Sequence, residues 1–595
     1  MRGKTLLHVA AGLLLVAGGA WSAGAAEKAA AVPTGSSTII KPVQEETCYA
    51  CHTQIKEMHA ANKHASVNCA FCHTGTDEHL AKGPASKPVT KTDHATCGTC
   101  HADQYESFLE LNLKSPARIE KATFKSRSPL FDKLIAGHGF AFEHAEPRQH
   151  VFMLMDHLIV DRAYGGRFQL KDWTEITNNQ AAAKDLWSIL TDAEPANDEQ
   201  KKFLPYVATA ANPVCLNCKT QDHILKWKYM GDKDPRAQWD RTSKPVAFAR
   251  DLKHPLNCFM CHDPHSTQPR VVRDGLIQAV VDKGAGTYPY DKAKSEKTKV
   301  TKVMFRDFRA IGLLSRPDSN TMCAQCHVEY NCNPGFDTRT GEYSVKMDSQ
   351  LTNFFPWVNV LDYKEKMDSV HFRDFKHAVT GALITKLQHP EAETNWGSKH
   401  ERAGVECKDC HMPKVKSGPQ GKTYTWHGQK SAKYMLHDTC VKCHAGWSEE
   451  QANYEIEAIQ NATNGKIIKA EFWLGQFIDA FAKAKAACVD EATLKEARGF
   501  HEKAHPLWEW WTAENSIGFH NPQIARQSLA TSIETSQAGI KFLNEAMAKV
   551  SKCEVVAAAP AAAPAPAAAP APAAAPAPAA APAAAPAKKE EPAKK

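Results

Sequence analysis

Hydrophobic periodicity divides the chain into two parts. Long runs with the 3.6-residue period of a helix are few before about residue 450, and three follow Trp447. Short connections between them predict an antiparallel bundle of long helices, with interruptions at Asn464-Gly465 and Pro506. The predicted helices are Ser448–Ala487, Glu491–Asn515 and Gln523–Val550.

The first residues have the pattern of a secretory signal. Arg2 and Lys4 precede the apolar stretch Leu6–Ala20, and small residues follow at a spacing that suits cleavage. This pattern predicts a signal peptide at 1–26 and a periplasmic protein in an oxidising compartment. The alternative is an uncleaved anchor, because the apolar run approaches the minimum length that spans a membrane.

The last segment, 554–595, is almost purely Ala and Pro and closes with Lys and Glu. Frequent proline prevents a continuous helix, and so little apolar surface cannot offset the ordering entropy. We predict a disordered, semi-extended tail.

Composition adds a chemical clue. The 595 residues include 19 cysteines and 28 histidines, with 23% charged residues and a formal charge of +7. The charged fraction excludes a multi-pass membrane protein, and the cysteine density is far below that of a small disulfide scaffold. Abundant Cys together with abundant His favours metal chemistry.

The sequence contains seven Cys-x-x-Cys-His motifs, which indicate the kind of metal site. The motif is the attachment signature of haem c, in which two thiols bond the haem and the histidine ligates iron. Roughly 0.03 occurrences are expected by chance at this composition. Zinc knuckles and thioredoxin-type pairs do not explain a histidine after every second cysteine. The motifs are Cys48-Cys51-His52, Cys69-Cys72-His73, Cys97-Cys100-His101, Cys258-Cys261-His262, Cys323-Cys326-His327, Cys407-Cys410-His411 and Cys440-Cys443-His444.

An eighth pair, Cys215 and Cys218, is followed by Lys219. It is either a disulfide or degenerate site, or a haem c with lysine as the proximal ligand. An ammonium group cannot ligate, so in the second case Lys219 must be held neutral by burial and by the iron. One irregular site among regular ones is where we expect substrate chemistry.

Electron-relay haems usually take a second histidine from elsewhere in the chain, and 21 histidines remain for that role. The sequence alone does not pair them. With few apolar runs before residue 450, the core is expected to be mostly haem, in short helices and loops. The predicted fold class is mainly α, a multihaem cytochrome c with little β structure, whose apoprotein folds only once haem is attached.

Three motifs resemble one family. Together, Cys215-x-x-Cys218-Lys219, Cys323–Tyr330 and Lys386-Leu-Gln-His-Pro-Glu391 closely resemble the cytochrome c nitrite reductases, from about residue 137 to 550. The eight sites are similar to those of octahaem members. The resemblance implies a three-haem electron-transfer region at 27–136, a five-haem catalytic region at 137–447 and a helical bundle at 448–553 that forms an oligomer interface.

The same resemblance implies residue roles. Lys219 would be the proximal ligand of the catalytic haem, with Arg162, Tyr330 and His389 as catalytic residues. Calcium, which takes oxygen ligands, would bind Glu329, the Tyr330 carbonyl, Gln388 and Lys386, the last only through its carbonyl.

The histidines expected as distal iron ligands fall into two groups, of which only the first is implied by the resemblance. By resemblance, the C-terminal bis-histidine haems take His150, His400, His427 and His520. For the N-terminal three, where the resemblance to the pentahaem enzymes ends, the candidates are His64, His94 and either His138 or His144.

The remaining cysteines have separate interpretations. Cys332 stands two residues after Tyr330, so in an extended segment both side chains point the same way. Octahaem relatives carry a Tyr–Cys thioether at this spacing, and we hypothesise one here; the alternative is an unreactive buried thiol. Cys488 and Cys553 lie at one end of the predicted bundle, where they either form a disulfide or stay free.

The implied function is six-electron reduction of nitrite to ammonium, with eight haems c and calcium as cofactors. Partners would be nitrite and a periplasmic or membrane-bound donor, either a quinol dehydrogenase or a small cytochrome, in a homo-oligomer. The rivals are a tetrathionate or sulfite reductase, a hydroxylamine oxidoreductase, and an electron carrier without a substrate site. Two propionates per haem outweigh the +7, so nucleic acid is not an expected partner.

Overall fold

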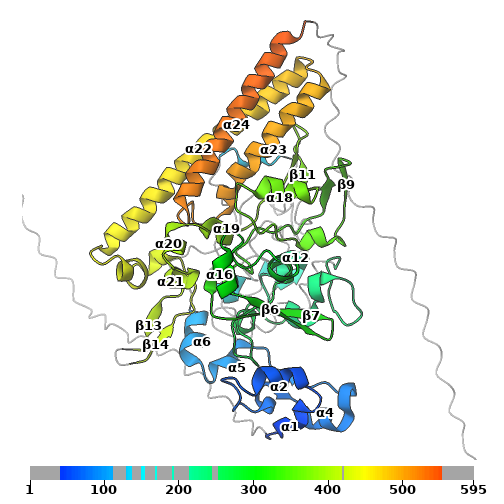
Figure 1. Cartoon of the computed structure of the whole chain (residues 1–595), viewed down its shortest axis with the longest axis vertical. Helices are drawn as coiled ribbons and strands as arrows, with labels where there is room; N and C mark the ends of the chain where they lie inside the picture. Colours follow the sequence, from blue (N-terminus) through cyan, green and yellow to red (C-terminus); the bar gives the residue numbers. More distant parts are fainter. Residues whose placement is uncertain are drawn as a thin grey trace, which may run out of the picture.

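The computed structural model describes residues 41–110, 129–136, 149–153, 168–170, 190–192, 213–243, 252–418 and 421–551. Short helices, a few two- or three-stranded sheets and three long C-terminal helices make up this part of the chain (Figure 1). The predicted mainly α fold with little β structure is therefore confirmed. Among the described residues, no helix combines the length and the apolar character needed to span a membrane.

The N-terminal region, residues 41–110, consists of short helices around three of the motifs and lies at the end of the molecule opposite the long helices (Figure 1). Its few buried apolar side chains include Tyr49, Met58 and Phe108. Its elements are α1 (Glu45–Tyr49), α2 (Thr53–His59), α3 (Cys69–Cys72), α4 (Thr76–Lys82), α5 (His94–Gly98), α6 (Ala102–Leu109) and the antiparallel pair β1 (His73–Thr74) and β2 (Val89–Thr90).

The central region, described residues 149–447, holds the other five cysteine pairs. Its helices are α12 (Pro213–Leu216), α13 (His223–Lys226), α15 (Asp274–Ile277), α16 (Lys292–Lys297), α17 (Ser319–Cys323), α18 (Tyr363–Ser369), α19 (Glu391–Asn395), α20 (Lys399–Arg402) and α21 (Cys407–His411). Its antiparallel sheets, in spatial order, are β3 (Phe168–Leu170) with β4 (Leu190–Asp192); β5 (Arg270–Val271), β7 (Arg309–Leu314) and β6 (Val300–Phe305); β10 (Phe372–Arg373), β8 (Gly335–Asp337) and β9 (Glu342–Val345); β11 (Phe375–Lys376) with β12 (Leu383–Ile384); and β13 (Lys414–Lys416) with β14 (Thr423–Thr425).

The bundle follows the predicted periodicity closely, as α22 (Glu449–Ala486), α23 (Glu491–Ala513) and α24 (Pro522–Lys549). Each helix begins at a polar N-cap whose side chain accepts a backbone N–H. The interruptions predicted at Asn464-Gly465 and Pro506 do not occur. Pro506 removes one helical hydrogen bond, but buried neighbours such as Trp508 hold α23 in place.

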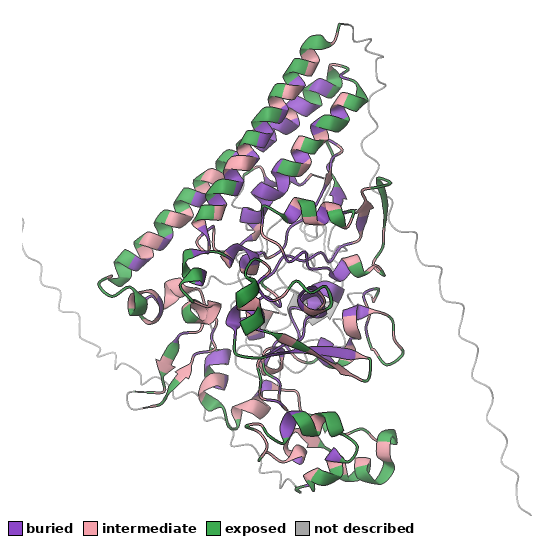
Figure 2. Ribbon diagram, in the orientation of Figure 1, coloured by how far each residue is buried: buried purple, intermediate pink, exposed green. Residues whose placement is uncertain are grey.

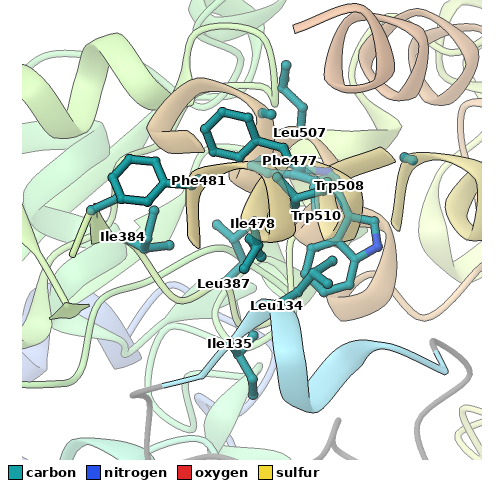
Figure 3. Packing of buried hydrophobic residues seen from close by; sticks show 14 of the residues in the cluster. Leu134, Ile135, Ile384, Leu387, Phe477, Ile478, Phe481, Leu507, Trp508 and Trp510 are labelled. Atoms are coloured by element: carbon teal, nitrogen blue, oxygen red, sulfur yellow. The ribbon is translucent and has the colours of Figure 1, made fainter. Parts of the chain in front are cut away.

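A cluster of buried apolar side chains joins the bundle to the central region. Figure 3 shows part of it, where Leu134 and Leu387 meet Ile478 of α22. Leu134 belongs to α8 (Phe131–Leu134), which lies in the predicted N-terminal segment 27–136 yet packs on the bundle because Phe131, Leu134 and Ile135 are buried there. Figure 2 shows burial concentrated in the bundle and the centre.

Candidate haem centres and active site

The Cys-x-x-Cys-His motifs share one local geometry. In five of the motifs the backbone N–H of the histidine bonds the carbonyl of the first cysteine at 2.9–3.0 Å, which closes one helical turn. Residues i, i+3 and i+4 of a turn lie on one face. The two thiols and the imidazole therefore project together, as attachment of one planar group requires. The motif histidines with this distance are His52, His101, His262, His327 and His444, and the His73 N–H makes the same bond to the Cys69 carbonyl.

Every motif histidine faces a second histidine, and the seven ring-centroid separations lie between 6.1 and 6.5 Å. Two imidazole nitrogens at ~2 Å from one metal, with ring radii of ~1.1 Å, give about 6.3 Å between centroids. Imidazoles in direct contact are closer, as with His377 and His501 at 4.7 Å. The pairs are His52–His79, His73–His265, His101–His64, His262–His427, His327–His150, His411–His520 and His444–His400.

Hydrogen bonds fix which ring nitrogen is free to ligate. In several paired histidines Nδ1 bonds a backbone carbonyl, which can only accept, so Nδ1 carries the proton. Nε2 then keeps its lone pair, the arrangement typical of a metal-ligating histidine. Burial also lowers the pKa of His262 and His411 to about 4, which keeps these rings neutral. The bonds are His64–Pro264 (2.9 Å), His79–Ser86 (2.6 Å), His411–Lys430 (2.9 Å) and His427–Thr425 (2.7 Å).

The structure brings most predicted distal histidines to a motif histidine. His64, His150, His400, His427 and His520 each face one. His138 and His144 lie outside the described residues.

His94 differs from these. Asp93 caps α5, and the His94 ring at the first turn stacks on Tyr105, with centroids 5.5 Å apart, instead of facing a motif histidine. His79 and His265 face His52 and His73, and the sequence analysis singled out neither. His265 comes from the central region, so chain proximity to the N-terminal motifs could not have found it.

The eighth pair lies in a buried environment. Lys219 is 4% exposed, and its Nζ donates to the Cys215 carbonyl at 3.0 Å. No carboxylate of the described residues forms an ion pair with it. The amine thus lies inside the protein beside the cysteine pair that it follows, where a haem attached at that pair would place its iron.

Tyr330 and Cys332 both lie beside this site and are almost fully buried. The Cys332 Sγ is 3.7 Å from the Cys215 Sγ. Burial raises the pKa of Tyr330 well above its usual value, and the neighbouring thiols of Cys218 and Cys332 raise it further. The i and i+2 side chains thus share one environment, as the extended segment predicts.

The loop with His389 is tied to the same segment. The Gln388 N–H donates to the Glu329 carboxylate at 2.7 Å, and the Gln388 amide approaches Cys332. His389 itself is half-buried and precedes α19. Arg162, the third predicted catalytic residue, lies outside the described residues.

The predicted calcium ligands fit a hard cation. Glu329, Lys386 and Gln388 are all buried, and desolvation raises the pKa of Glu329 well above its usual value, the penalty that a bound cation would remove. The Lys386 ammonium is engaged with Glu509 at 2.6 Å. Only its backbone carbonyl is left for calcium, as predicted.

Arg273 is a feature that the sequence analysis missed. It is fully buried over the Tyr330 ring, 5.3 Å from the ring centroid, and its three guanidinium nitrogens have no hydrogen-bond partner. The neighbouring carboxylate of Asp274 accepts from Trp227 at 2.9 Å and lies 3.8 Å from Arg309. A buried cation without an anion is costly, and a haem propionate is an anion that fits here.

Thiols of different motifs touch and so order the sites in space. Side-chain hydrogen bonds link Cys48 with Cys69, Cys97 with Cys258, Cys218 with Cys326, and Cys323 with Cys407. The Cys323–His327 motif therefore adjoins both the Lys219 site and the Cys407–His411 motif. Groups attached at these cysteines would be close neighbours, as electron transfer needs.

Only one of the two cysteines of the predicted disulfide lies in the described part of the chain. Cys488, just after α22, is disulfide-bonded. Cys553, its predicted partner, lies outside the described residues.

Comparison with known proteins gives consistent similarities. Residues 182–593 match the sequence model of one protein family, cytochrome c552. The cytochrome c nitrite reductase subunit NrfA of Nitratidesulfovibrio vulgaris is 26% identical over 464 residues, 74% of either chain. A cytochrome c-552 of Aliarcobacter butzleri is 29% identical over 433 residues, 71% of this chain and 77% of the relative.

Among solved structures, the cytochrome c nitrite reductase of Desulfovibrio desulfuricans, whose catalytic subunit has two calcium sites, shares the fold. Its TM-score is 0.52 at 24% identity, over 77% of this chain and 87% of that one. The first three motifs precede the stretch that the family model matches.

Proposed function

The chain belongs to the cytochrome c552 family, and we propose from this that it reduces nitrite to ammonium at a haem c ligated by Lys219. Membership makes it a haem-containing oxidoreductase of electron transport. The observation that carries the finer proposal is the contrast between seven paired motif histidines and one buried, unpaired lysine site beside Tyr330.

The proposal assigns eight haems c, seven of them with the histidine pairs described above as axial ligands. It assigns calcium to Glu329, Gln388 and the Tyr330 and Lys386 carbonyls. Nδ1 bonding, ring separation and the orphaned Arg273 guanidinium support haem, and the desolvated Glu329 supports calcium.

A haem attached at Cys215 and Cys218 and ligated by Lys219 would supply an iron site for nitrite. Reduction of nitrite to ammonium consumes six electrons and eight protons and releases two water molecules. Arg162 and His389 donate hydrogen bonds to the nitrite oxygens and stabilise charge as the N–O bonds break. His389 is the imidazole of the proposed site, so we assign it the delivery of protons for water release. Tyr330, held by Glu329 and crosslinked to Cys332, positions the substrate. Arg162→Ala and His389→Ala should each cut turnover sharply.

An electron paramagnetic resonance spectrum tests the proposal. We expect one high-spin ferric haem whose signal shifts on nitrite addition, and ammonium formed in a one-to-one ratio to nitrite consumed. A wholly low-spin spectrum that ignores nitrite would identify an electron carrier instead. Faster turnover of tetrathionate, sulfite or hydroxylamine would assign the site to one of those reactions.

The proposal includes self-association through α22. Tyr454, Ile468 and Phe472 are 64, 43 and 49% exposed on this helix. They belong to an exposed row that advances by alternate steps of four and three residues, the spacing of a helix–helix seam. The row is Tyr454, Ala458, Asn461, Gly465, Ile468 and Phe472. Its small residues allow close approach, and a second copy of the helix fits it.

The location and the donor complete the proposal. The signal pattern of 1–26 supports the periplasm, although these residues lie outside the described part. The N-terminal region, with its three motifs and exposed Cys51 and Cys100, would receive electrons from a quinol dehydrogenase or a small cytochrome.

A further inference from the structure

The N-terminal region meets the central region at two places. Its last helix, α6, packs there through Phe108 and through hydrogen bonds such as the one from the His427 N–H to Ser107 at 3.0 Å. Residues 41–100 touch the central region through fewer, mostly polar contacts. His64 donates from Nδ1 to the Pro264 carbonyl at 2.9 Å, and Asn257 donates to the Thr92 carbonyl at 2.7 Å. Met58 is the only apolar side chain of the region in the cluster that includes Ile311 and Leu313, among the described residues. Among the described residues, the segment 41–100 therefore has few contacts of its own that hold it on the central region.

One histidine pair crosses this surface. His73 belongs to the second motif of the N-terminal region, and His265 belongs to the central region; their rings are 6.2 Å apart and nearly parallel, at 8°. The other two pairs of the N-terminal region, His52–His79 and His64–His101, are internal to it. The three sites therefore have the same ring spacing but different topology.

Hydrogen bonds within the central region position the loop that carries His265. The Asp263 carboxylate accepts the backbone N–H of His265 at 3.0 Å and of Ser266 at 2.8 Å, and its other oxygen pairs with Arg270 at 2.7 Å. Asp263 and Arg270 are both buried. The loop that presents His265 is thus held beside β5 by bonds within the central region, and His64 adds one bond to it from the N-terminal region.

The proposed function makes His73 and His265 the two axial ligands of the haem at Cys69 and Cys72. We propose further that this haem docks residues 41–100 onto the central region. The inference rests on the haem c assignment of the proposed function but not on nitrite as substrate. The iron binds both halves only when they are docked, so ligation stabilises the docked state. Docking in turn keeps Cys97 beside Cys258, where electrons would pass toward the Lys219 site.

Two matched variants of the full-length holoprotein separate ligation from docking. His265→Ala and His79→Ala each remove one distal histidine from an N-terminal haem, so each should convert one low-spin haem to high-spin. Hydrogen–deuterium exchange at the Thr92–Asn257 contact should rise by about tenfold in His265→Ala and stay unchanged in His79→Ala. Added imidazole should restore the low-spin signal of His265→Ala without slowing the exchange.

Two further variants keep the proposal open to contradiction. His265→Met, whose thioether can still ligate, should stay docked and raise the reduction potential of that haem. His94→Ala should leave every haem low-spin. A high-spin haem in His94→Ala but not in His265→Ala, or unchanged exchange in His265→Ala, would overturn the inference. Neither readout uses nitrite, so a wrong substrate assignment would leave both intact.

Discussion

At the scale of single residues, the proposed relay sites and the proposed reactive site differ in the residue that follows the second cysteine, which is histidine in seven motifs and Lys219 in the eighth. A paired imidazole leaves iron no open position, whereas Lys219 is buried against the Cys215 carbonyl and faces no second histidine among the described pairs. Cys332 and Tyr330 sit beside that site. Reactivity is therefore expected where the regular pattern is broken.

Replacing Lys219 tests this reading. Lys219→His should still attach haem, because both thiols remain, but should lose most nitrite turnover, by about tenfold or more, since an imidazole changes electron donation to the iron. Haem content by mass spectrometry and ammonium formation measure the two effects. Lys233→His, at an exposed position nearby, is the control. Near-native turnover of Lys219→His would contradict a special role for the lysine.

Arg273 gives a second prediction at this scale. A buried cation stabilises the reduced form of a neighbouring haem, so Arg273→Gln should lower one reduction potential, by about 60 mV if the lost interaction is worth a factor of ten. A spectroelectrochemical titration measures it. Arg339→Gln, whose exposed guanidinium pairs with Asp337, should leave all potentials in place. Unchanged potentials in Arg273→Gln would show that no propionate lies near it.

At the scale of elements, the helical bundle has one face that packs on the rest of the protein and one that is exposed. Its inner face packs α8 and the Leu387 loop, and so fixes the segment that precedes His389. Trp510 of α23 also donates to Thr394 of α19 at 2.8 Å. The outer face of α22 presents the exposed row from Tyr454 to Phe472. The loop with His389 and the proposed interface thus lie against different faces of one helical unit.

Charge on the outer row should break self-association. Ile468→Glu with Phe472→Glu places like charges against each other in a paired seam, so a dimer should become a monomer by light scattering after size-exclusion chromatography. Lys541→Glu, on an exposed site of α24, is the control. The haem spectrum should not change, because neither residue is buried. An unaltered mass for the double variant would move the interface elsewhere.

At the scale of the whole molecule, the two ends depend on haem to different degrees. The bundle has its own apolar core, whereas the N-terminal region has few buried apolar residues and three histidine pairs with space for a metal between them. A chain made without haem should keep part of its helical circular dichroism, from α22–α24, while residues 41–110 exchange their amide hydrogens rapidly. Strong protection of 41–110 in that apoprotein would contradict this.

The sequence predicted features that are local. The period of the last helices gave their bounds to within a few residues, and the motifs gave the local turn that aims two thiols and a histidine one way. Pairing across the fold was not local: His94 and His79 look alike in sequence, yet His79 faces the motif residue His52 whereas His94 stacks on Tyr105. Pro506 does not interrupt α23, because the buried side chains around it stabilise the helix by more than the loss of one hydrogen bond costs.

The pairing of His73 with His265 also sets an order of assembly. A chain that emerges from its N-terminus presents His52, His64, His73, His79 and His101 early, so two of the three N-terminal sites can close within the first hundred residues. If haem is bound as proposed, the third would wait, with its iron open on one side, until the segment with His265 has folded. That interval leaves one haem exposed to stray ligands and to oxidants, and it ends only when maturation reaches the central region.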